Sequence, residues 1–239
     1  MKTIMQNTNR APAKSTNELE SILQDVLVRA KKLGATDASV SISHDTGFSV
    51  DVRMGAVETV AFNEDRGVGL TVYIGQRKGS ASSSDTSSTA LETMVSAAIE
   101  IAKVSAQDSC FGLPERELMS TAYPDLDLNH PWDLTPPEAI EIALRCEKEA
   151  RGLDKRIVNS DGVNLGTYSF CNGFANTQGA FGVVKSTRHS LSCSLIAAEG
   201  ELMQRDYDYT TSRVPSELLP LEQLARSAVS RTVSRLGAR

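Results

Sequence analysis

The residues of this sequence that could carry chemistry are its three histidines and four cysteines. His44, His130 and His189 are followed by Asp, Pro and Ser, so none of them starts the His-Glu helix signature that binds zinc in metalloproteases. The cysteines lie far apart and form no Cys-x-x-Cys pair: Cys110, Cys146, Cys171 and Cys193. The spacing therefore predicts no metal site in this chain, and we expect reduced thiols rather than a disulfide framework.

Two further patterns could suggest a nucleophile. His189 and Cys193 are four residues apart, which on a strand is about 13 Å, so they share a face but cannot hydrogen-bond to each other. We interpret Cys193 as a small buried apolar residue and His189 as a half-exposed strand residue satisfied by a neighbour. The serines at 80–84 followed by Asp85 are typical of a polar strand end that runs into a helix N-cap, with a reactive serine as the alternative. The chain has neither a Gly-x-Ser-x-Gly elbow nor a phosphate loop, so we predict no catalytic residue.

Charged and aromatic residues alternate at Gln204–Tyr209, a pattern that concerns recognition more than catalysis. We interpret this segment as a solvated strand face with tyrosines packed behind it. The alternative is an interface with Arg205 and Tyr207 as contact residues, because arginine and tyrosine are favoured anchors. The polar run that begins at Asn63 and includes Arg66 is interpreted as a turn, with partner recognition as the alternative.

Four stretches have apolar residues at the spacing of an amphipathic helix: residues 19–33, 91–102, 135–151 and 218–236. The first follows a possible capping box of Ser15 and Glu18, and Gly34 closes it. The third starts with Thr135 as N-cap, then two prolines, then Glu138 reaching back to the cap.

Between the helices the apolar period changes from 3.6 to 2, which predicts antiparallel strands. We expect strands at residues 38–42, 48–52, 57–62, 68–74, 77–83, 191–197 and 202–210. Turn signals stand at residues 45–47, 55, 63–67, 160–162, 172–173 and 199–200. Hairpin-linked strands flanked by helices predict an α+β fold, with antiparallel sheets and the order helix–strands–helix occurring twice.

The stretch 105–134 contains three prolines and little periodicity, so we expect the internal boundary there. The predicted organisation is a disordered leader at 1–15, a first α+β unit at 16–104, a connecting segment at 105–134 and a second α+β unit at 135–239. Trp132 lies in the connecting segment and needs a place to bury its ring.

The formal net charge of −5 and a sequence pI of about 5.3 argue against a protein that binds nucleic acid directly. The basic stripe Arg231, Arg235 and Arg239 is better explained as complementing a helix dipole, since Glu217 and Glu222 stand at the other end of the segment. No stretch has the length of a membrane span, and the polar N-terminus lacks the apolar region of a signal peptide. We therefore expect a cytoplasmic protein without a membrane partner.

Several separate motifs lie between about Leu19 and Arg239: Asn63–Gly69, Arg77–Ala81, Asp125–Trp132, Ser190–Cys193, Met203–Tyr207 and Arg231–Arg239. Together they resemble the N-terminal half of PmbA/TldE proteins, of the TldD/PmbA family that is also called modulator of DNA gyrase. The resemblance implies that the predicted units together form the N-terminal domain of a longer, cytoplasmic protein.

The resemblance also implies a two-subunit protease that degrades flexible peptides. In that family the TldD-type subunit carries zinc on a His-Glu-x-x-x-His helix, and the PmbA/TldE-type subunit lacks this motif and pairs with it. The zinc helix belongs to the half that follows the equivalent of Arg239, so the subunit type rests on the motifs above, which resemble PmbA/TldE more than TldD. No cofactor is expected in this chain, and zinc is expected in the TldD-type partner.

Our leading hypothesis is a non-catalytic subunit domain that docks the TldD-type subunit and helps to enclose an unstructured peptide. Such a peptide can add to a sheet edge by backbone pairing. The strand 77–83, which includes Ala81 and Ser83, is a candidate edge because its small residues crowd an incoming backbone least. The alternatives are a regulatory or scaffold domain without peptide contact and an independent hydrolase with an unrecognised site.

Overall fold

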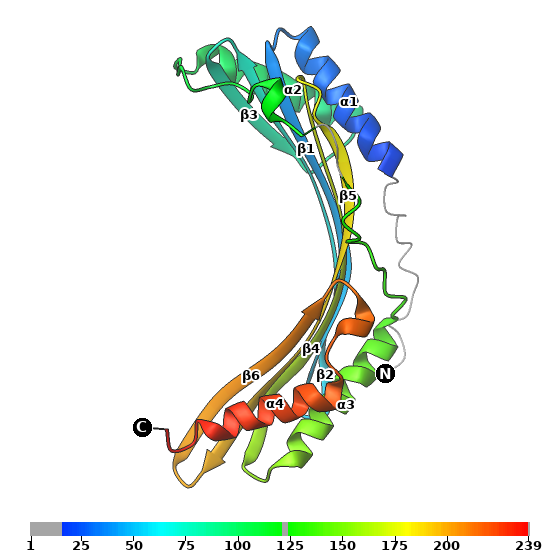
Figure 1. The fold of residues 1–239 in the computed structure, drawn as a ribbon, viewed down its shortest axis with the longest axis vertical. Coiled ribbons are helices and arrows are strands. Elements are labelled where there is room, and N and C mark those ends of the chain that lie inside the picture. Colours follow the sequence, from blue (N-terminus) through cyan, green and yellow to red (C-terminus); the bar gives the residue numbers. More distant parts are fainter. Residues whose placement is uncertain (1–15, 121–123, 239) are drawn as a thin grey trace. The chain divides into compact units, whose positions relative to one another are not determined.

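A computed structural model describes residues 16–120 and 124–238 (Figure 1). The elements follow in chain order: α1 (Thr16–Lys32), β1 (Asp37–Arg53), β2 (Ala56–Ile74), β3 (Arg77–Ser83), α2 (Ser88–Val104), the 3-10 helix η1 (Arg116–Leu118), α3 (Pro136–Leu153), β4 (Ile157–Asn176), β5 (Phe181–Glu199), β6 (Leu202–Ser212), the 3-10 helix η2 (Pro215–Glu217) and α4 (Leu221–Ser234). Within these described residues, no helix combines the length and the apolar character needed to cross a membrane. The predicted leader, including Ser15, lies outside the described residues.

The start of α3 and the end of α1 match the local chemistry predicted for them. Thr135 accepts a hydrogen bond from the Glu138 backbone, and the Glu138 carboxylate accepts one from the Thr135 amide at 2.8 Å, which confirms the capping box of α3. Gly34 follows α1 with φ of 99°, a conformation that glycine adopts without strain. All four predicted helices are confirmed.

The strands form one antiparallel sheet in the order β3-β2-β1-β4-β5-β6, so the predicted α+β class is confirmed. Strands β2 and β3 pair in the register Thr71↔Ser80, and β5 and β6 pair in the register Ser194↔Tyr207. The strand Arg77–Ser83 is therefore an outermost strand of the sheet, as β6 is on the other side.

Four predicted turns are wrong, because β1, β2 and β4 run straight through them: residues 45–47, 63–67, 160–162 and 172–173. Gly47 serves close packing instead, since a Cβ there would overlap the Tyr168 side chain. Gly173 lies against the side chains of Leu23 and Ile42 for the same reason. At Gly162 the strand continues with φ of 114°, a local irregularity in which the Gly162 amide donates to Ser160 Oγ at 3.0 Å.

Two compact units can be distinguished, and each draws on three separate stretches of sequence. Unit 1 combines residues 1–44, 66–122 and 172–183, and unit 2 combines residues 45–65, 123–171 and 184–239, each within the described parts of the chain. The sequence-continuous division with a connecting segment at 105–134 stays a prediction.

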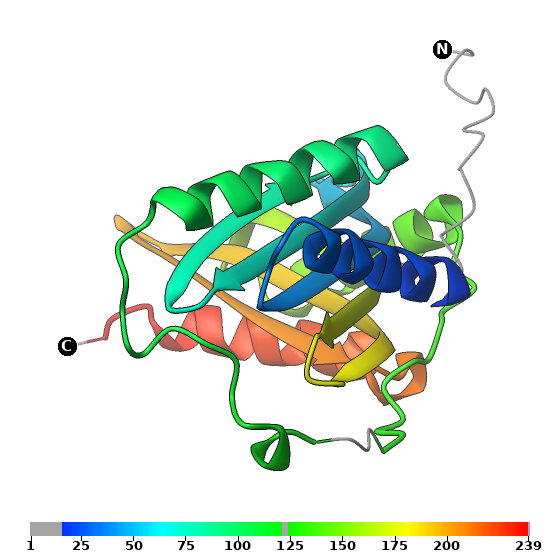
Figure 2. The same cartoon turned by 90° about the horizontal axis from the view of Figure 1, so that it is seen from above.

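In unit 1, α1 and α2 lie side by side and α2 packs on β3 (Figure 2). Arg29 of α1 joins the two helices by donating to the Ser88 carbonyl at 2.9 Å and to the Ser88 hydroxyl at 2.8 Å. Helix α2 sits so close to β3 that a Cβ on Gly79 would overlap the backbone of Ala98 and Ala102. The largest fully buried side chains of unit 1 come from α1, β1 and β2: Leu19, Leu23, Val26, Val40 and Leu70.

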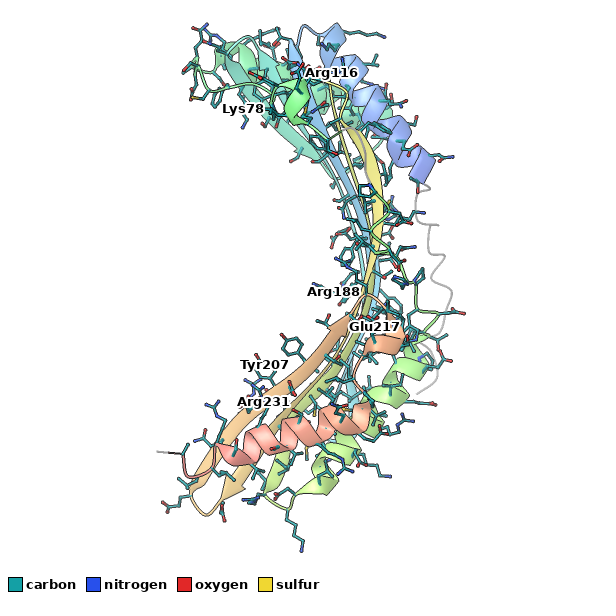
Figure 3. All side chains as sticks on the ribbon, in the orientation of Figure 1. Lys78, Arg116, Arg188, Tyr207, Glu217 and Arg231 are labelled. Atoms are coloured by element: carbon teal, nitrogen blue, oxygen red, sulfur yellow. The ribbon has the colours of Figure 1, made fainter. Side chains whose placement is uncertain are left out.

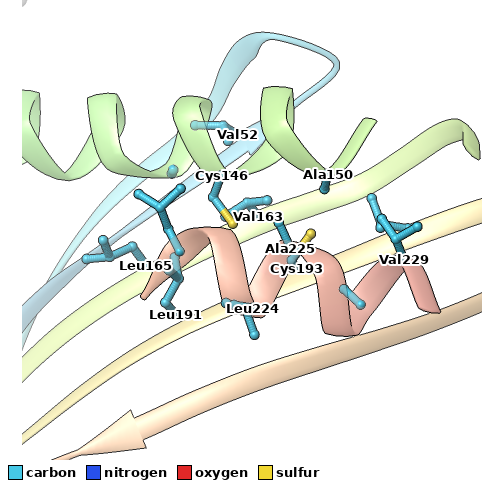
Figure 4. Close-up of a cluster of buried hydrophobic side chains, with 14 of the residues drawn as sticks. Val52, Cys146, Ala150, Val163, Leu165, Leu191, Cys193, Leu224, Ala225 and Val229 are labelled. Carbon is cyan, nitrogen blue, oxygen red and sulfur yellow. The ribbon is translucent and has the colours of Figure 1, made fainter. Parts of the chain in front are cut away.

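In unit 2, α3 and α4 pack against each other, and α4 packs on β6. Figure 4 shows the apolar cluster between these helices and the strands, with Cys146 of α3 near Cys193 of β5. Both thiols are fully buried, which confirms the prediction of Cys193 as a core residue. A hydrogen bond with Cys146 and burial both raise the pKa of the Cys193 thiol, so it remains protonated and unreactive.

A buried carboxylate holds the turn between β1 and β2. Glu147 of α3 is 1% exposed, and its two oxygens accept the backbone amides of Met54 at 2.8 Å and Gly55 at 2.7 Å. Both turn residues have positive φ, 52° and 80°. Positive φ at both central residues is typical of the two-residue turns that connect antiparallel strands. Glu147 accepts hydrogen bonds from the two amides that this turn leaves unpaired.

Candidate functional site

His189 has a structural environment rather than a catalytic one. It is 1% exposed, so its predicted half-exposed position is wrong. Its ring bonds the Thr167 hydroxyl at 2.8 Å through Nδ1 and the His130 carbonyl at 3.0 Å through Nε2. Trp132 packs edge-on against the ring at 5.5 Å, so the residues before α3 are fixed on β5 by this histidine.

The other histidines do not complete a site either. His130 Nε2 lies 2.9 Å from the Asp127 carbonyl and 3.3 Å from its carboxylate, in a local turn where Asp127 has φ of 50°. His44 is buried in unit 1. Among the described residues, no three His, Cys, Asp or Glu side chains come together as metal ligands. The residues present do not fit a zinc ion, and no step of zinc chemistry is assigned to them.

The serine run ends β3 and leads into the predicted N-cap of α2. Ser83 Oγ donates to the Asp85 carbonyl at 2.8 Å, and Asp85 accepts the Ser87 amide at 2.7 Å and the Ser87 hydroxyl at 3.0 Å. These bonds, the backbone one first, lower the pKa of Asp85. Ser87 in turn accepts from Ala90 as the N-cap of α2. Ser83 is thus part of the turn before the N-cap, whereas Ser80 and Ser82 belong to β3 itself.

The candidate residues of unit 1 surround two neighbouring pockets on a strand face built of small residues. One pocket, of about 590 Å³, is lined by Arg66 and Ser83, and the next, of about 350 Å³, by Ala81. Their floor is made of hydroxyls and bare backbone: Ser41, Ser43, Gly67, Gly69, Ser80 and Ser82. This surface offers hydrogen-bonding groups and one guanidinium, and the described residues that line it include no histidine, cysteine or carboxylate that could act as a base.

The register of β3 refines how its residues meet these pockets. The hydroxyls of Ser80 and Thr71 lie 3.0 Å apart on the pocket face, and Gly79 faces α2. Because side chains alternate along a strand, Ser82 shares the face of Ser80, and Ala81 shares the face of Gly79. Ala81 therefore lines its pocket mainly with backbone atoms, while Ser82 lines both pockets.

In unit 2, β6 reverses the predicted orientation of its aromatic residues. Tyr207 and Tyr209 are 51% and 56% exposed and stack at 6.3 Å, so the interpretation of tyrosines packed behind a charged face is wrong (Figure 3). The reason is that Asp206 and Asp208 turn toward α4 instead. Asp208 accepts from Ser227, and Asp206 lies 3.3 Å from the Arg235 guanidinium.

Arg231 of α4 and its C-cap residue Arg235 pair with β6, which was not predicted from the sequence. Arg231 and Arg235 are one helical turn apart and face the two aspartates of β6, at 3.9 Å for Arg231 and Asp206. The pKa of Asp206 is lowered, and the main cause is a hydrogen bond from the Tyr207 amide. Burial raises this pKa, while the contacts with Arg235 and Arg231 lower it. Acidic residues at period 2 and basic residues at period 4 could have indicated this strand–helix pairing.

The structure brings some of the six predicted contact residues together and leaves others apart. Arg66, Ala81 and Ser83 meet at the pockets of unit 1. Arg205 and Tyr207 share the exposed face of β6, where Arg205 pairs with Asp161 at 2.5 Å. Asn63 lies on the exposed part of β2 in unit 2 rather than in a turn. Their contacts with a peptide or partner stay predictions.

Comparisons with known proteins are consistent along the chain. The model of "PmbA/TldA metallopeptidase domain 1" matches residues 38–102, and that of the "PmbA/TldA metallopeptidase central domain" matches residues 129–236. The chain is 43% identical over 91% of its length to "Metalloprotease PmbA" of Escherichia coli O157:H7 and 36% identical over 92% to a homologue in Haemophilus influenzae. It spans about half the length of these relatives, 49% and 48%.

Solved structures agree on the fold. A putative modulator of DNA gyrase from Bacteroides thetaiotaomicron superposes with a TM-score of 0.85 at 26% identity, over 94% of this chain and 51% of that one. TldE from Thermococcus kodakarensis shares the fold alone, with a TM-score of 0.72 at 15% identity, over 87% of this chain and 46% of that one. The two domain models and the close relatives show that the chain belongs to the PmbA/TldD metallopeptidase family, as a protein of the PmbA/TldE type.

Proposed function

We propose that this chain belongs to the non-catalytic, TldE-type subunit of a two-subunit metalloprotease that degrades or processes flexible peptides in the cytoplasm. The observation that carries the proposal is the 43% identity over 91% of the chain to a protein named metalloprotease PmbA. The motifs Asn63–Gly69 and Met203–Tyr207, which resemble PmbA/TldE more than TldD, support the subunit type.

The zinc of the proposed protease is assigned to a TldD-type partner subunit. In the family the zinc helix belongs to the half that follows the equivalent of Arg239, so this assignment rests on the motifs that resemble PmbA/TldE more than TldD. The role proposed for this chain is to dock that partner and to enclose the peptide. The small-residue face of unit 1 supports peptide contact, because glycine and serine allow an extended backbone to lie close to the strands.

The test is hydrolysis of an unstructured peptide by the protein alone and mixed with a TldD-type subunit, with and without a chelator. We expect chelator-sensitive hydrolysis in the mixture alone. Hydrolysis by this protein without the partner would contradict the proposal in favour of an independent hydrolase. Full activity of the TldD-type subunit without this protein would contradict it as well.

Peptide contact is tested separately with Ser82→Trp, because Ser82 lines both pockets of unit 1. The bulky ring fills the space above the glycine floor, so we expect slower peptide turnover by the mixture with pairing to the partner unchanged. Ser230→Trp on the exposed surface of α4 is the matched control. Equal turnover by both variants would favour the scaffold alternative, in which this chain does not touch the peptide.

A further inference from the structure

Two arginines of unit 2 lie beside one pocket, and no carboxylate of the described part of the chain pairs with either of them. The pocket, of about 400 Å³, is lined by Arg188 of β5 and by Arg213, the residue after β6, with Ser186, Thr211 and Phe170 around them. The register His189↔Ser212 places Arg188 and Arg213 at neighbouring positions on the two strands. In a chain of net charge −5, two adjacent guanidinium groups at one pocket are a departure from the overall charge.

Neither arginine forms an ion pair within the described residues. Arg213 donates to the Thr187 carbonyl at 3.2 Å, which satisfies one of its five N–H groups. Glu217, four residues after Arg213, accepts from the Ser212 hydroxyl at 2.9 Å. Most donors of both guanidinium groups therefore remain available to a ligand.

Arg188 is held in place by aromatic rings rather than by charge. Its guanidinium carbon lies 5.8 Å from the Tyr168 ring centre and 5.7 Å from that of Phe170, within the range of a cation–π contact. The two rings are themselves stacked at 6.4 Å.

The ring of Tyr168 in turn packs against two glycines. It occupies the space that a Cβ would take at Gly47 of β1 and Gly166 of β4. A side chain at either position would displace the ring and with it the contact to Arg188. The two glycines thus leave room for the Tyr168 ring, and the ring holds Arg188 in place before a ligand binds. This order lowers the entropic cost of binding.

From this geometry we infer that the pocket between Arg188 and Arg213 binds a carboxylate of a peptide chain. Paired guanidinium groups suit a carboxylate because each presents parallel N–H donors to its two oxygens. Bound in this way, the carboxylate offsets the repulsion between the arginines, and the hydroxyls of Ser186 and Thr211 line the same pocket. The choice of a peptide as ligand rests on the proposed function. The pocket would add recognition of a peptide carboxylate to that function.

Binding is measured with dye-labelled peptides of one neutral sequence by fluorescence anisotropy on the protein alone, so no hydrolysis or partner is needed. The peptide is prepared as a free acid, as a C-terminal amide and as an amide with one internal Glu. We expect the amide to bind about tenfold more weakly than at least one carboxylate form, and added salt to reduce the difference. Preference for the free acid identifies a C-terminal carboxylate, and preference for the Glu peptide identifies a side chain.

The variants Arg188→Gln and Arg213→Gln should each remove this preference, and Arg188→Lys should restore it partly because lysine keeps the charge without the fork. Arg226→Gln, on the exposed surface of α4, removes the same charge outside the pocket and should leave binding unchanged. Equal binding of all three peptides, or a preference that survives both Gln variants, would overturn the inference. Displacement by inorganic phosphate without any carboxylate preference would also overturn it. None of these outcomes depends on the hydrolysis assay, so the proposed function can fail or stand separately.

Discussion

Glu147 satisfies two backbone amides at once, and this makes the β1–β2 turn depend on one side chain of α3. In Glu147→Gln one acceptor oxygen becomes an NH₂ group that faces an amide donor. We expect the free energy of unfolding to fall by about 2–3 kcal/mol, the cost of hydrogen bonds to a charged group left unmade. Denaturant unfolding measures this loss. Glu141→Gln, exposed on the same helix, should stay within about 0.5 kcal/mol of the parent, and equal losses in both would contradict the role of Glu147.

At Asp154 the pH dependence of stability has a direct structural cause. The Arg156 side chain donates to its carboxylate at 3.0 and 2.7 Å, and this contact, with the Arg156 amide, lowers the pKa of Asp154 to about 2. A lowered folded-state pKa stabilises the protein above pH of about 4, and this contribution is lost as pH falls toward 2. In Arg156→Gln an NMR titration of the carboxyl carbon should give a pKa closer to 3.8. Arg145→Gln, exposed on α3, should leave the titration unchanged, and an unchanged value in Arg156→Gln would refute the cause.

At the scale of elements, the packing of α2 on β3 depends on the missing side chain of Gly79. A methyl group there would overlap the backbone of α2, which cannot move aside as a flexible side chain can. We expect Gly79→Ala to lower the free energy of unfolding by about 1–3 kcal/mol. Gly112→Ala is the control, because no atom lies within 4 Å of the added carbon. Thermal unfolding that shows the same shift in both variants would mean that α2 tolerates the displacement.

Elements with strong local signals were predictable, and features that depend on distant residues were not. The capping residues Thr135 and Glu138 lie within one helical turn, so the start of α3 could be predicted from sequence. Gly47 was instead predicted as a turn because glycine favours turns, and its actual role depends on Tyr168, which is remote in sequence. The same holds for the candidate site: Arg188 and Arg213 become neighbours through the β5–β6 register, which a single sequence does not specify.

For the whole molecule, the order of chain segments in the two units limits how the protein can be divided. Unit 2 includes residues 45–65, which supply Phe48, Val50 and Val52 to its core cluster. A fragment of residues 135–239 should therefore fail to unfold cooperatively, and mixing it with a fragment of residues 1–134 should restore a cooperative transition in near-UV circular dichroism. Cooperative unfolding of the 135–239 fragment alone would show that strands from the first half are dispensable.

The paired thiols in the core of unit 2 allow the rate at which this core opens to be measured by chemical modification. Cys110 is exposed and the other three cysteines are buried, so a thiol reagent should modify one residue rapidly and the rest only when the protein opens. Because Cys146 and Cys193 meet between α3 and β5, their modification requires that helix and strand separate. Mass spectrometry of the labelled peptides over time would then distinguish loss of this core from loosening elsewhere, without an introduced probe.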